Sequence, residues 1–400
     1  MGAAYIYDAI RTPRGRAKAD GGLHDLSPHE LLRALYHTLE QRTWLNPALV
    51  GEVILGCVTQ YGEQGGNIAK TSTLYAGWPS TVGGLTVNRF CSSGIDAISL
   101  AALKITAGQE QVIVAGGVEM MSRVPMLADK AAVFVDPAFA AQCRMLMMGS
   151  GADLIATLCN VSREQADAIA LQSQQRADKA RREGYFSSII PVHNPVKGIT
   201  VSEDECIRAN ASRESLAKLP PAFAELGSRG VDALQLAGHP GLTAIRHVHT
   251  AGNSPAMADA AALVLLGDLA LGDQLEIRPR ARIVDAATAS DDPLQVLSGC
   301  VAATRKLMDR QGLTAADVDL FELHEAFAAT VIMCRQELDI PADKLNVNGG
   351  VIALGHPMGA TGAIMAGTLL DELERRGKRR GIVAASGAAG AGSALLLECV

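Results

Sequence analysis

The two halves of this 400-residue chain repeat one order of predicted elements. Each repeat contains an apolar strand, a glycine-containing turn, a helix and a second apolar strand that ends in glycines. The interval from Gly56 to Gly94 in the first half equals the interval from His324 to Gly362 in the second. The shared order and spacing indicate a duplicated α/β unit.

Composition limits how such units can pack. Hydrophobic residues make up 48% of the chain but aromatic residues only 4%, so the core must be built from small aliphatic side chains, which favours closely approached layers of helices and sheets. Between the halves, residues 123–249 contain the polar helical stretch 162–184 and then segments with Pro, Lys and Glu. We therefore expect an N-terminal half at 1–122 plus 250–270, an inserted loop domain at 123–249 and a C-terminal half at 271–400.

Several classes of protein are disfavoured. The formal charge of −6 and the pI near 5.9 argue against a nucleic-acid partner. The first residues lack an apolar signal core, and no apolar run is long enough to span a bilayer. Eight scattered cysteines without paired spacing indicate reduced thiols, and hence a cytoplasmic protein, and no histidine, cysteine or carboxylate cluster predicts a metal site.

The stretch NRFCSSG, residues 88–94, places Cys91 between an extended run and a helical one. Apolar residues recur at helical spacing from Ile95 onward, so we expect a helix with one buried stripe. The N-terminal end of a helix favours a thiolate, which predicts a lowered pKa and a nucleophilic role for Cys91, with Gly94 leaving room for a substrate. The alternative is a buried structural cysteine, because free cysteines are among the most buried residues.

The stretch NGGVIALGHPMGATG, residues 348–362, predicts a strand at VIAL that ends in a tight turn. Pro357 restricts the backbone of His356 to extended geometry, so its imidazole should project from the turn, where it could accept a proton from a thiol. The alternative is a histidine whose hydrogen bonds are satisfied within the turn. Cys91 and His356 occupy equivalent turns of the two repeats, and this equivalence favours a joint role.

Two more strand ends carry candidate residues. In LFELHEAFAAT, residues 320–330, His324 ends a strand and could donate to an oxyanion or hold a water that does so; alternatively, His324 and Glu325 cap the following helix. In IVAASGAAGAGSALLLE, residues 382–398, small residues expose N–H groups that could form an oxyanion hole or an anion nest. The spacing GxxGxG and the short remaining chain argue against a dinucleotide-binding loop.

Seven ordered blocks extend over essentially the whole chain: NRFCSSG, GGVEMMSRVP, MGSGADLIA, TAGN, HEAFA, NVNGGVIALGHPMGATG and the Gly/Ala-rich end. With these blocks the sequence resembles the thiolase family, the acetyl-CoA acyltransferases. The resemblance implies an α/β fold of two similar halves in five αβαβα layers with an inserted loop domain. It also implies a homodimer or homotetramer that acts on coenzyme A (CoA) esters in fatty acid β-oxidation and needs no cofactor beyond CoA as a substrate.

The resemblance also assigns roles to individual residues. It implies that Cys91 is the nucleophile that becomes acylated, that His356 activates it and helps bind the thioester oxygen, and that His324 holds the water of an oxyanion hole. The backbone N–H groups of Cys91 and Ala388 match a second oxyanion hole. The positions that match the lining of the pantetheine channel are Met148, Ala326 and Phe327.

Three departures from the family pattern stand out. Ser386 occupies the place of the usual second cysteine, the acid/base for the acetyl-CoA carbon, and a hydroxyl is far less acidic than a thiol. Pro255 and Ala256 replace the usual Ser-Gly at the CoA arm. Residues 226–246 are an apparent insertion that could reshape the acyl pocket.

These features leave two hypotheses. In the favoured one, the chain cleaves 3-ketoacyl-CoA with free CoA through an acyl group on Cys91, or runs the reverse condensation. In the other, it is a thiolase-like CoA-ester binder or structural subunit whose carbon–carbon chemistry is impaired at Ser386; an intermediate form retains acyl transfer alone.

Overall fold

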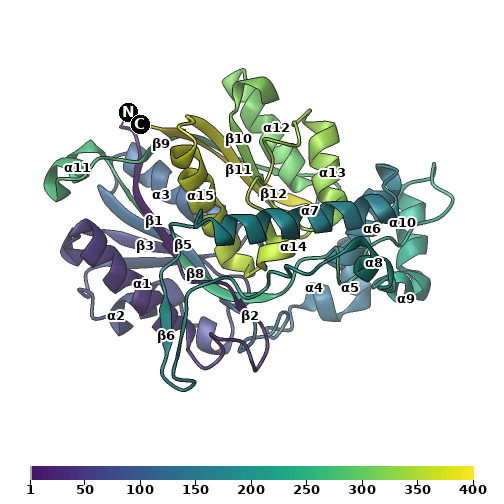
Figure 1. Cartoon of the computed structure of the whole chain (residues 1–400), viewed down its shortest axis with the longest axis horizontal. Helices are drawn as coiled ribbons and strands as arrows, with labels where there is room; N and C mark the ends of the chain where they lie inside the picture. The colour runs from purple at the N-terminus through teal and green to yellow at the C-terminus, as the bar shows by residue number, and fades with distance from the viewer. Residues whose placement is uncertain (1) are drawn as a thin grey trace.

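The computed structural model describes residues 2–400 and contains two half-sheets joined at their edges (Figure 1). The first has the strand order β4 (Gly83–Val87), β3 (Glu52–Gly56), β5 (Val112–Met120), β8 (Ala258–Gly267) and β1 (Tyr5–Arg11), with β2 (Gly15–Arg16) on β8. The second has the order β9 (Ala281–Ser290), β12 (Ala391–Cys399), β11 (Arg380–Ser386) and β10 (Leu320–Leu323). The junction between β1 and β9 is short, with Tyr5 opposite Arg282 and Ile6 opposite Ala281.

The two half-sheets have the same pattern of strand directions. In the first, β3 runs parallel to β4 and β5, whereas β8 runs antiparallel to β5 and β1. In the second, β10 is parallel to β11, and β12 is antiparallel to β11 and β9. A parallel bridge from Phe321 to Leu345 takes the place of β4. The predicted duplication is therefore confirmed.

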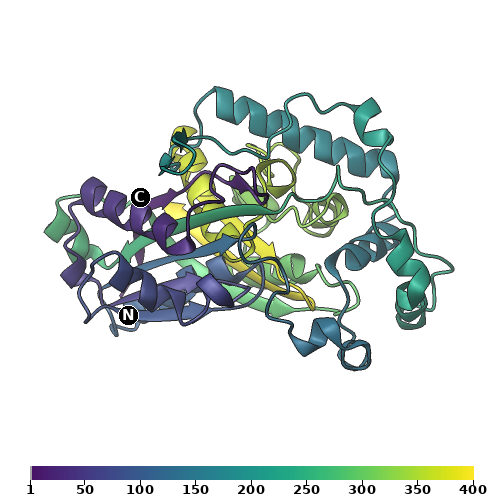
Figure 2. The ribbon, with the colours of Figure 1, turned by 90° about the horizontal axis from the view of Figure 1, so that it is seen from below.

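Helices complete five layers (Figures 1 and 2). Helices α3 (Ser93–Thr106) and α15 (Met358–Arg375) share the central core with residues of both half-sheets. Helices α1 (Pro28–Thr43) and α2 (Ile68–Tyr75) pack in a second core on the first half-sheet, and α12 (Gly299–Gln311) and α13 (Ala328–Glu337) in a third core on the second. Because α15 is buried without a break from Met358 to Leu373, this layer depends on the small side chains that dominate the composition.

Gly94 and Gly362 lie where α3 and α15 cross. A Cβ atom on Gly94 would stand 2.6 Å from the backbone nitrogen of Ala363, and one on Gly362 would stand 2.5 Å from that of Ile95. The expectation that Gly94 leaves room for a substrate was wrong, because α15 occupies that space. The glycines instead bring the N-terminal ends of the two repeat helices together.

The segment between the halves is mostly helical. It contains α4 (Ala132–Val135), α5 (Pro137–Gln142), α6 (Met148–Leu158), α7 (Arg163–Arg182), α8 (Arg213–Ala217), α9 (Ala224–Leu226), a π-helical turn (Gly227–Val231), α10 (Asp232–Gly238) and the hairpin β6 (Val192–Asn194) and β7 (Ile199–Val201). Helix α7 confirms the helix predicted for the polar stretch, and it begins with a capping box in which Ser162 and Gln165 exchange hydrogen bonds. Within residues 2–400, no helix is both long and apolar enough to cross a bilayer.

Other short elements connect these layers: α11 (Leu269–Leu275), α14 (Val351–Leu354) and three 3₁₀ turns (Pro47–Leu49, Gly62–Gln64 and Ala315–Asp317). Helix α14 is the VIAL segment, for which a strand was predicted. That prediction was wrong, because an apolar run of four residues fits a buried helical turn as well as a buried strand.

Candidate active site

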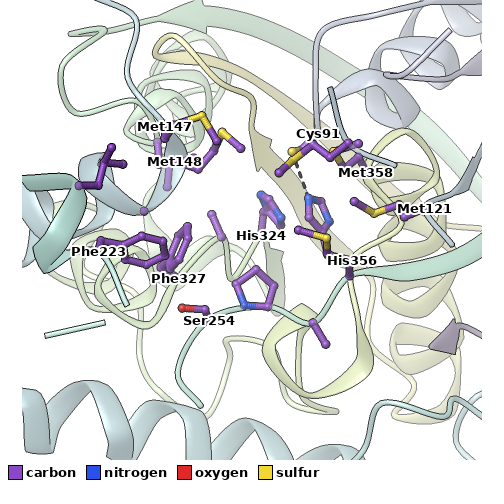
Figure 3. Close-up of a pocket in the computed structure, with 18 residues that line it drawn as sticks. Cys91, Met121, Met147, Met148, Phe223, Ser254, His324, Phe327, His356 and Met358 are labelled. Atoms are coloured by element: carbon purple, nitrogen blue, oxygen red, sulfur yellow. Dashed lines mark hydrogen bonds between the residues drawn. The ribbon is translucent and has the colours of Figure 1, made fainter. Parts of the chain in front are cut away.

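An apolar cavity of about 270 Å³ opens where the two repeats meet the inserted segment (Figure 3). Cys91, His356, Met121 and Met358 lie at one end of it. Met147, Met148, Phe223 and Phe327 lie at the other end, and the ring of His324 lies between the two groups. The cavity therefore runs past three residues for which the sequence predicted a role.

The turn that carries Cys91 is held from both sides. Phe90 has a positive φ of 50°, an uncommon conformation for a side chain of this size, and helix α3 begins two residues after Cys91 at Ser93. The Ser92 hydroxyl donates to the carbonyl of Ala385 at 2.8 Å, and the N–H of Arg89 donates to the hydroxyl of Ser93 at 2.9 Å. The first repeat's turn is thereby tied to strand β11 of the second.

Cys91 and His356 form the central pair of the cavity. The Sγ atom of Cys91 lies 3.1 Å from Nε2 of His356. Burial, together with the charge of Glu119, raises the pKa of the Cys91 thiol to about 12, so the predicted lowering of this pKa was wrong. Burial also lowers the pKa of His356 well below its ordinary value, and His324 and Arg14 add to this effect. The resting pair is therefore a thiol beside a neutral imidazole, which is the arrangement for general-base activation.

The tautomer of His356 follows from its second nitrogen. Nδ1 of His356 lies 2.8 Å from the hydroxyl oxygen of Thr361, and that hydroxyl donates to the carbonyl of Pro357 at 3.2 Å. Because the hydroxyl hydrogen is used, the oxygen accepts from Nδ1–H, and Nε2 keeps its lone pair for Cys91. The backbone N–H of His356 donates to the carbonyl of Ala256 at 2.8 Å, which fixes the turn further.

His324 follows β10 and is buried beside His356, with ring centroids 4.5 Å apart. Neither ring nitrogen makes a hydrogen bond of ordinary geometry within residues 2–400. Burial lowers the pKa of His324 to about 4, and the nearby carbonyl of Ser386 only partly opposes this shift. A neutral imidazole with free nitrogens in an apolar cavity can donate to a developing oxyanion. Its neighbour Glu325 accepts from Ser173 at 2.7 Å instead of capping α13.

Ser386 and Ala388 lie beside this site but outside the cavity lining. The Ser386 hydroxyl donates to the carbonyl of Leu297 at 2.5 Å and accepts from the N–H of Cys300 at 2.9 Å. Ala388 is buried in the turn after β11, where the neighbouring Gly387 faces the carbonyl oxygen of Arg89 and the side chain of Phe90. The structure thus brings Cys91, His356 and His324 together and directs the side chain of Ser386 elsewhere.

The residues predicted for the pantetheine channel line the cavity, and so do the two residues that replace the usual Ser-Gly near the CoA arm. These residues are Met148, Ala326, Phe327, Pro255 and Ala256. Phe223 and Leu226, next to and at the start of the apparent insertion, form part of the same wall. The insertion therefore helps to shape the cavity.

Sequence reasoning missed Glu119, a buried carboxylate that joins the turns of both repeats. It accepts from the N–H groups of Val58 at 2.9 Å, Thr59 at 3.1 Å and Gly359 at 2.9 Å, and from the amide of Gln64 at 2.8 Å. Gly359 stands in the first turn of α15, where a negative charge is favourable. The only signal in the sequence was an acidic residue within an otherwise apolar strand.

Comparisons with known proteins bear on the family and the fold of the chain. Residues 4–233 match the family model "Thiolase, N-terminal domain", and residues 277–399 match "Thiolase, C-terminal domain". A 3-oxoadipyl-CoA/3-oxo-5,6-dehydrosuberyl-CoA thiolase of Escherichia coli strain K12 and a 3-ketoacyl-CoA thiolase of Colwellia psychrerythraea are each 37% identical, over 100% of both chains. The crystal structure of Bacillus anthracis acetyl-CoA acetyltransferase superposes with a TM-score of 0.87 at 34% identity, covering 100% of this chain and 99% of that one. The predicted fold class is confirmed.

Proposed function

Because the chain belongs to the thiolase family of acyltransferases, we propose that it cleaves a 3-ketoacyl-CoA with free CoA, giving acetyl-CoA and a shortened acyl-CoA. The observation that carries this proposal is the 3.1 Å contact between Cys91 Sγ and His356 Nε2 inside an apolar cavity. Such a cavity excludes water, which would otherwise hydrolyse an acyl-enzyme.

The reaction begins when His356 Nε2 takes the proton of the Cys91 thiol and the sulfur attacks the 3-keto carbon. The C2–C3 bond then breaks, its electron pair remains on C2, and His356 returns the proton to that carbon, so that acetyl-CoA leaves. The acyl group stays on Cys91 as a thioester. In the second half, His356 takes the proton of free CoA, whose sulfur attacks this thioester. The Cys91 sulfur leaves as the thiolate and takes that proton back from His356, which restores the resting pair.

Stabilisation of the oxyanion is assigned to His324. Its ring lies beside that of His356, and its nitrogens make no ordinary hydrogen bond within the described chain. A neutral N–H donor that is preoriented in an apolar site stabilises developing negative charge without reorganisation. The same position suits a donor that acts through a bound water.

The second candidate function is acyl transfer or CoA-ester binding without carbon–carbon chemistry. The Ser386 hydroxyl is engaged with Leu297 and Cys300, so the cavity lacks the usual second acid/base at this position. In that case Cys91 would still be acylated by simple thioesters, because Cys91 and His356 are in place.

Intact-protein mass spectrometry separates these functions. The purified chain is mixed with 3-oxohexanoyl-CoA in the absence of free CoA, and the released acetyl-CoA is measured. A butanoyl adduct that is absent in Cys91→Ala, with one acetyl-CoA released per adduct, supports thiolysis. Acetylation by acetyl-CoA without any adduct from the ketoacyl ester supports acyl transfer alone. No adduct from either ester contradicts both thiolysis and acyl transfer, and leaves only CoA-ester binding.

We also propose that the chain forms a homodimer through the edge strand β4. Exposed apolar side chains gather on β4 and the two helices that flank it: Leu74, Tyr75, Leu85 and Leu103. An uncovered edge strand with apolar neighbours is a typical site of self-association. Light scattering should give the mass of a dimer for the wild type and of a monomer for Leu85→Lys; a monomeric wild type contradicts the proposal.

A further inference from the structure

Four methionines that line the cavity lie near the pair Cys91 and His356 and are together called the methionine end: Met121, Met126 and Met358 belong to the cluster of Cys91, and Met257 forms an isolated β-bridge with His356. Met121 and Met358 pack with Cys91 in one buried cluster, and Met126 packs against it (Figure 3). Met121 and Met257 come from neighbouring strand ends, because Met120 of β5 pairs with Asp259 of β8. The sulfur of Cys91 thus stands in an apolar, flexible environment built from four separate segments.

The direction of the substrate follows from the proposed function, on which this inference rests. Met148 and Phe327 lie at the opposite end of the cavity, where the pantetheine arm is expected. In a 3-ketoacyl-CoA, the attacked carbon lies between the thioester and the rest of the acyl chain. When that carbon reaches Cys91, the remaining acyl group extends away from the arm and into the methionine end.

The methionine end offers no partner for an anion. Within the described chain, none of the cavity-lining residues is Lys, Arg, Asp or Glu, and burial lowers the pKa values of both lining histidines, so that they are neutral. Arg123 lies in sequence between Met121 and Met126, but its guanidinium donates hydrogen bonds to Glu63 and to the carbonyl of His24. A carboxylate placed beside Met121 and Met358, which are both buried, would lose its hydration without gaining a counter-charge.

We propose that the methionine end is the seat of the acyl group and selects 3-ketoacyl-CoA esters with a neutral, apolar tail over esters whose tail ends in a carboxylate. The relatives include both kinds by name: the Escherichia coli relative is named for 3-oxoadipyl-CoA, and the Colwellia relative for 3-ketoacyl-CoA. In this chain, the uncharged lining of the cavity favours substrates with a neutral acyl tail.

A matched pair of six-carbon substrates tests the proposal. 3-Oxohexanoyl-CoA ends in a methyl group and 3-oxoadipyl-CoA in a carboxylate, with the reacting atoms unchanged. We expect kcat/KM for thiolysis to be at least about 100-fold higher for 3-oxohexanoyl-CoA, because a buried site without a partner rejects a charge strongly. Similar values, or a preference for 3-oxoadipyl-CoA, would overturn the selectivity.

A charge variant locates the seat. Met257 lines the cavity and is 52% exposed, so Met257→Lys adds a cation at the methionine end where the side chain can still reach solvent. In this variant, we expect the ratio of kcat/KM for 3-oxohexanoyl-CoA to kcat/KM for 3-oxoadipyl-CoA to fall at least about tenfold. Leu269→Lys is the matched control, because Leu269 is 57% exposed on α11 and does not line the cavity. An unchanged preference in Met257→Lys, or an equal change in Leu269→Lys, contradicts the location.

A binding measurement separates this inference from the proposed function. If neither ester is cleaved, thiolysis itself has failed, and calorimetry with hexanoyl-CoA and adipyl-CoA still reports on the acyl seat. If hexanoyl-CoA binds more tightly than adipyl-CoA, and Met257→Lys reduces this difference, the methionine end is supported as the seat of the acyl group even without turnover. Equal binding of the two esters overturns it.

Discussion

Thr361 orients the imidazole of His356: its hydroxyl oxygen lies 2.8 Å from Nδ1 while its hydrogen is given to the carbonyl of Pro357. Thr361 lies in the first turn of α15 and His356 just before this helix, so the helix that separates the half-sheets also sets the tautomer of the base. A second residue is therefore needed for His356 to present its lone pair to Cys91.

Replacing Thr361 by Val removes the acceptor and keeps the shape. We expect kcat for acyl transfer to fall at least about tenfold, because Nδ1–H loses its partner and the proton can move to Nε2. Thr361→Ser restores the hydroxyl and should recover most of the rate. Steady-state kinetics of both variants provide the check; equal losses in Val and Ser would indicate a packing role for the threonine instead.

Replacing Ser386 by Cys tests whether position 386 is the acid/base site, because thiolysis and acetyl transfer should respond differently. Ser386→Cys introduces the acidic group that the family pattern has at this position. Because a thiol is a weaker hydrogen-bond partner than a hydroxyl, it is held less firmly by Leu297 and Cys300 and can turn toward the cavity, and we expect thiolysis of 3-ketoacyl-CoA to rise about tenfold or more. Acetyl transfer from acetyl-CoA to Cys91 should change little, since it needs no proton on carbon. If thiolysis does not increase, the position is not the acid/base site.

Ser386→Ala tests the structural contacts of the same hydroxyl. Its loss leaves the carbonyl of Leu297 and the N–H of Cys300 unpaired in a buried region. We expect the free energy of unfolding to fall by about 1–3 kcal/mol. Chemical denaturation monitored by circular dichroism measures this change, and a stability equal to the wild type would mean that the two contacts contribute nothing.

The raised pKa of Cys91 predicts a specific pH dependence. With the thiol pKa at about 12, the free thiolate is scarce near neutral pH, and deprotonation depends on His356. We expect His356→Asn to lower the acetylation rate by about 100- to 10,000-fold. The residual rate should then rise about tenfold per pH unit between about pH 7 and 10 without a plateau, since the thiolate fraction grows in that proportion below the pKa. A plateau near pH 8 in the variant would show that the thiol is not strongly perturbed.

Local sequence correctly predicted that Cys91 and His356 lie together, but it did not predict their environment. The helix after Cys91 and the turn at His356 follow from spacing, glycine and proline. The pKa of Cys91 could not be predicted, because it depends on burial by residues from distant segments, among them Glu119 and Met358. The direction of the Ser386 hydroxyl depends on Leu297, which is remote in sequence.

A bridging histidine, His247, holds the inserted segment. His247 places Nδ1 2.9 Å from Asp153 of α6 and Nε2 3.0 Å from Asp232 of α10. Burial alone would lower the pKa of His247, but the hydrogen bonds and charges of the two carboxylates outweigh it and leave the pKa raised. His247 therefore links the insertion to the helix that carries Met148, and the two carboxylates favour its protonated form.

The sign of the resulting pH dependence follows from the raised pKa. A group whose pKa is higher in the folded state stabilises fully below its unfolded pKa, about 6.5 for histidine, and this contribution is lost as the pH rises through the folded value. We expect His247→Gln to lower Tm most near pH 5.5, and the difference from the wild type to shrink by about pH 9. His193→Gln, at an exposed histidine, is the control and should leave Tm unchanged at every pH. A His247→Gln effect that is constant with pH would show that the bridge acts through packing rather than through its charge.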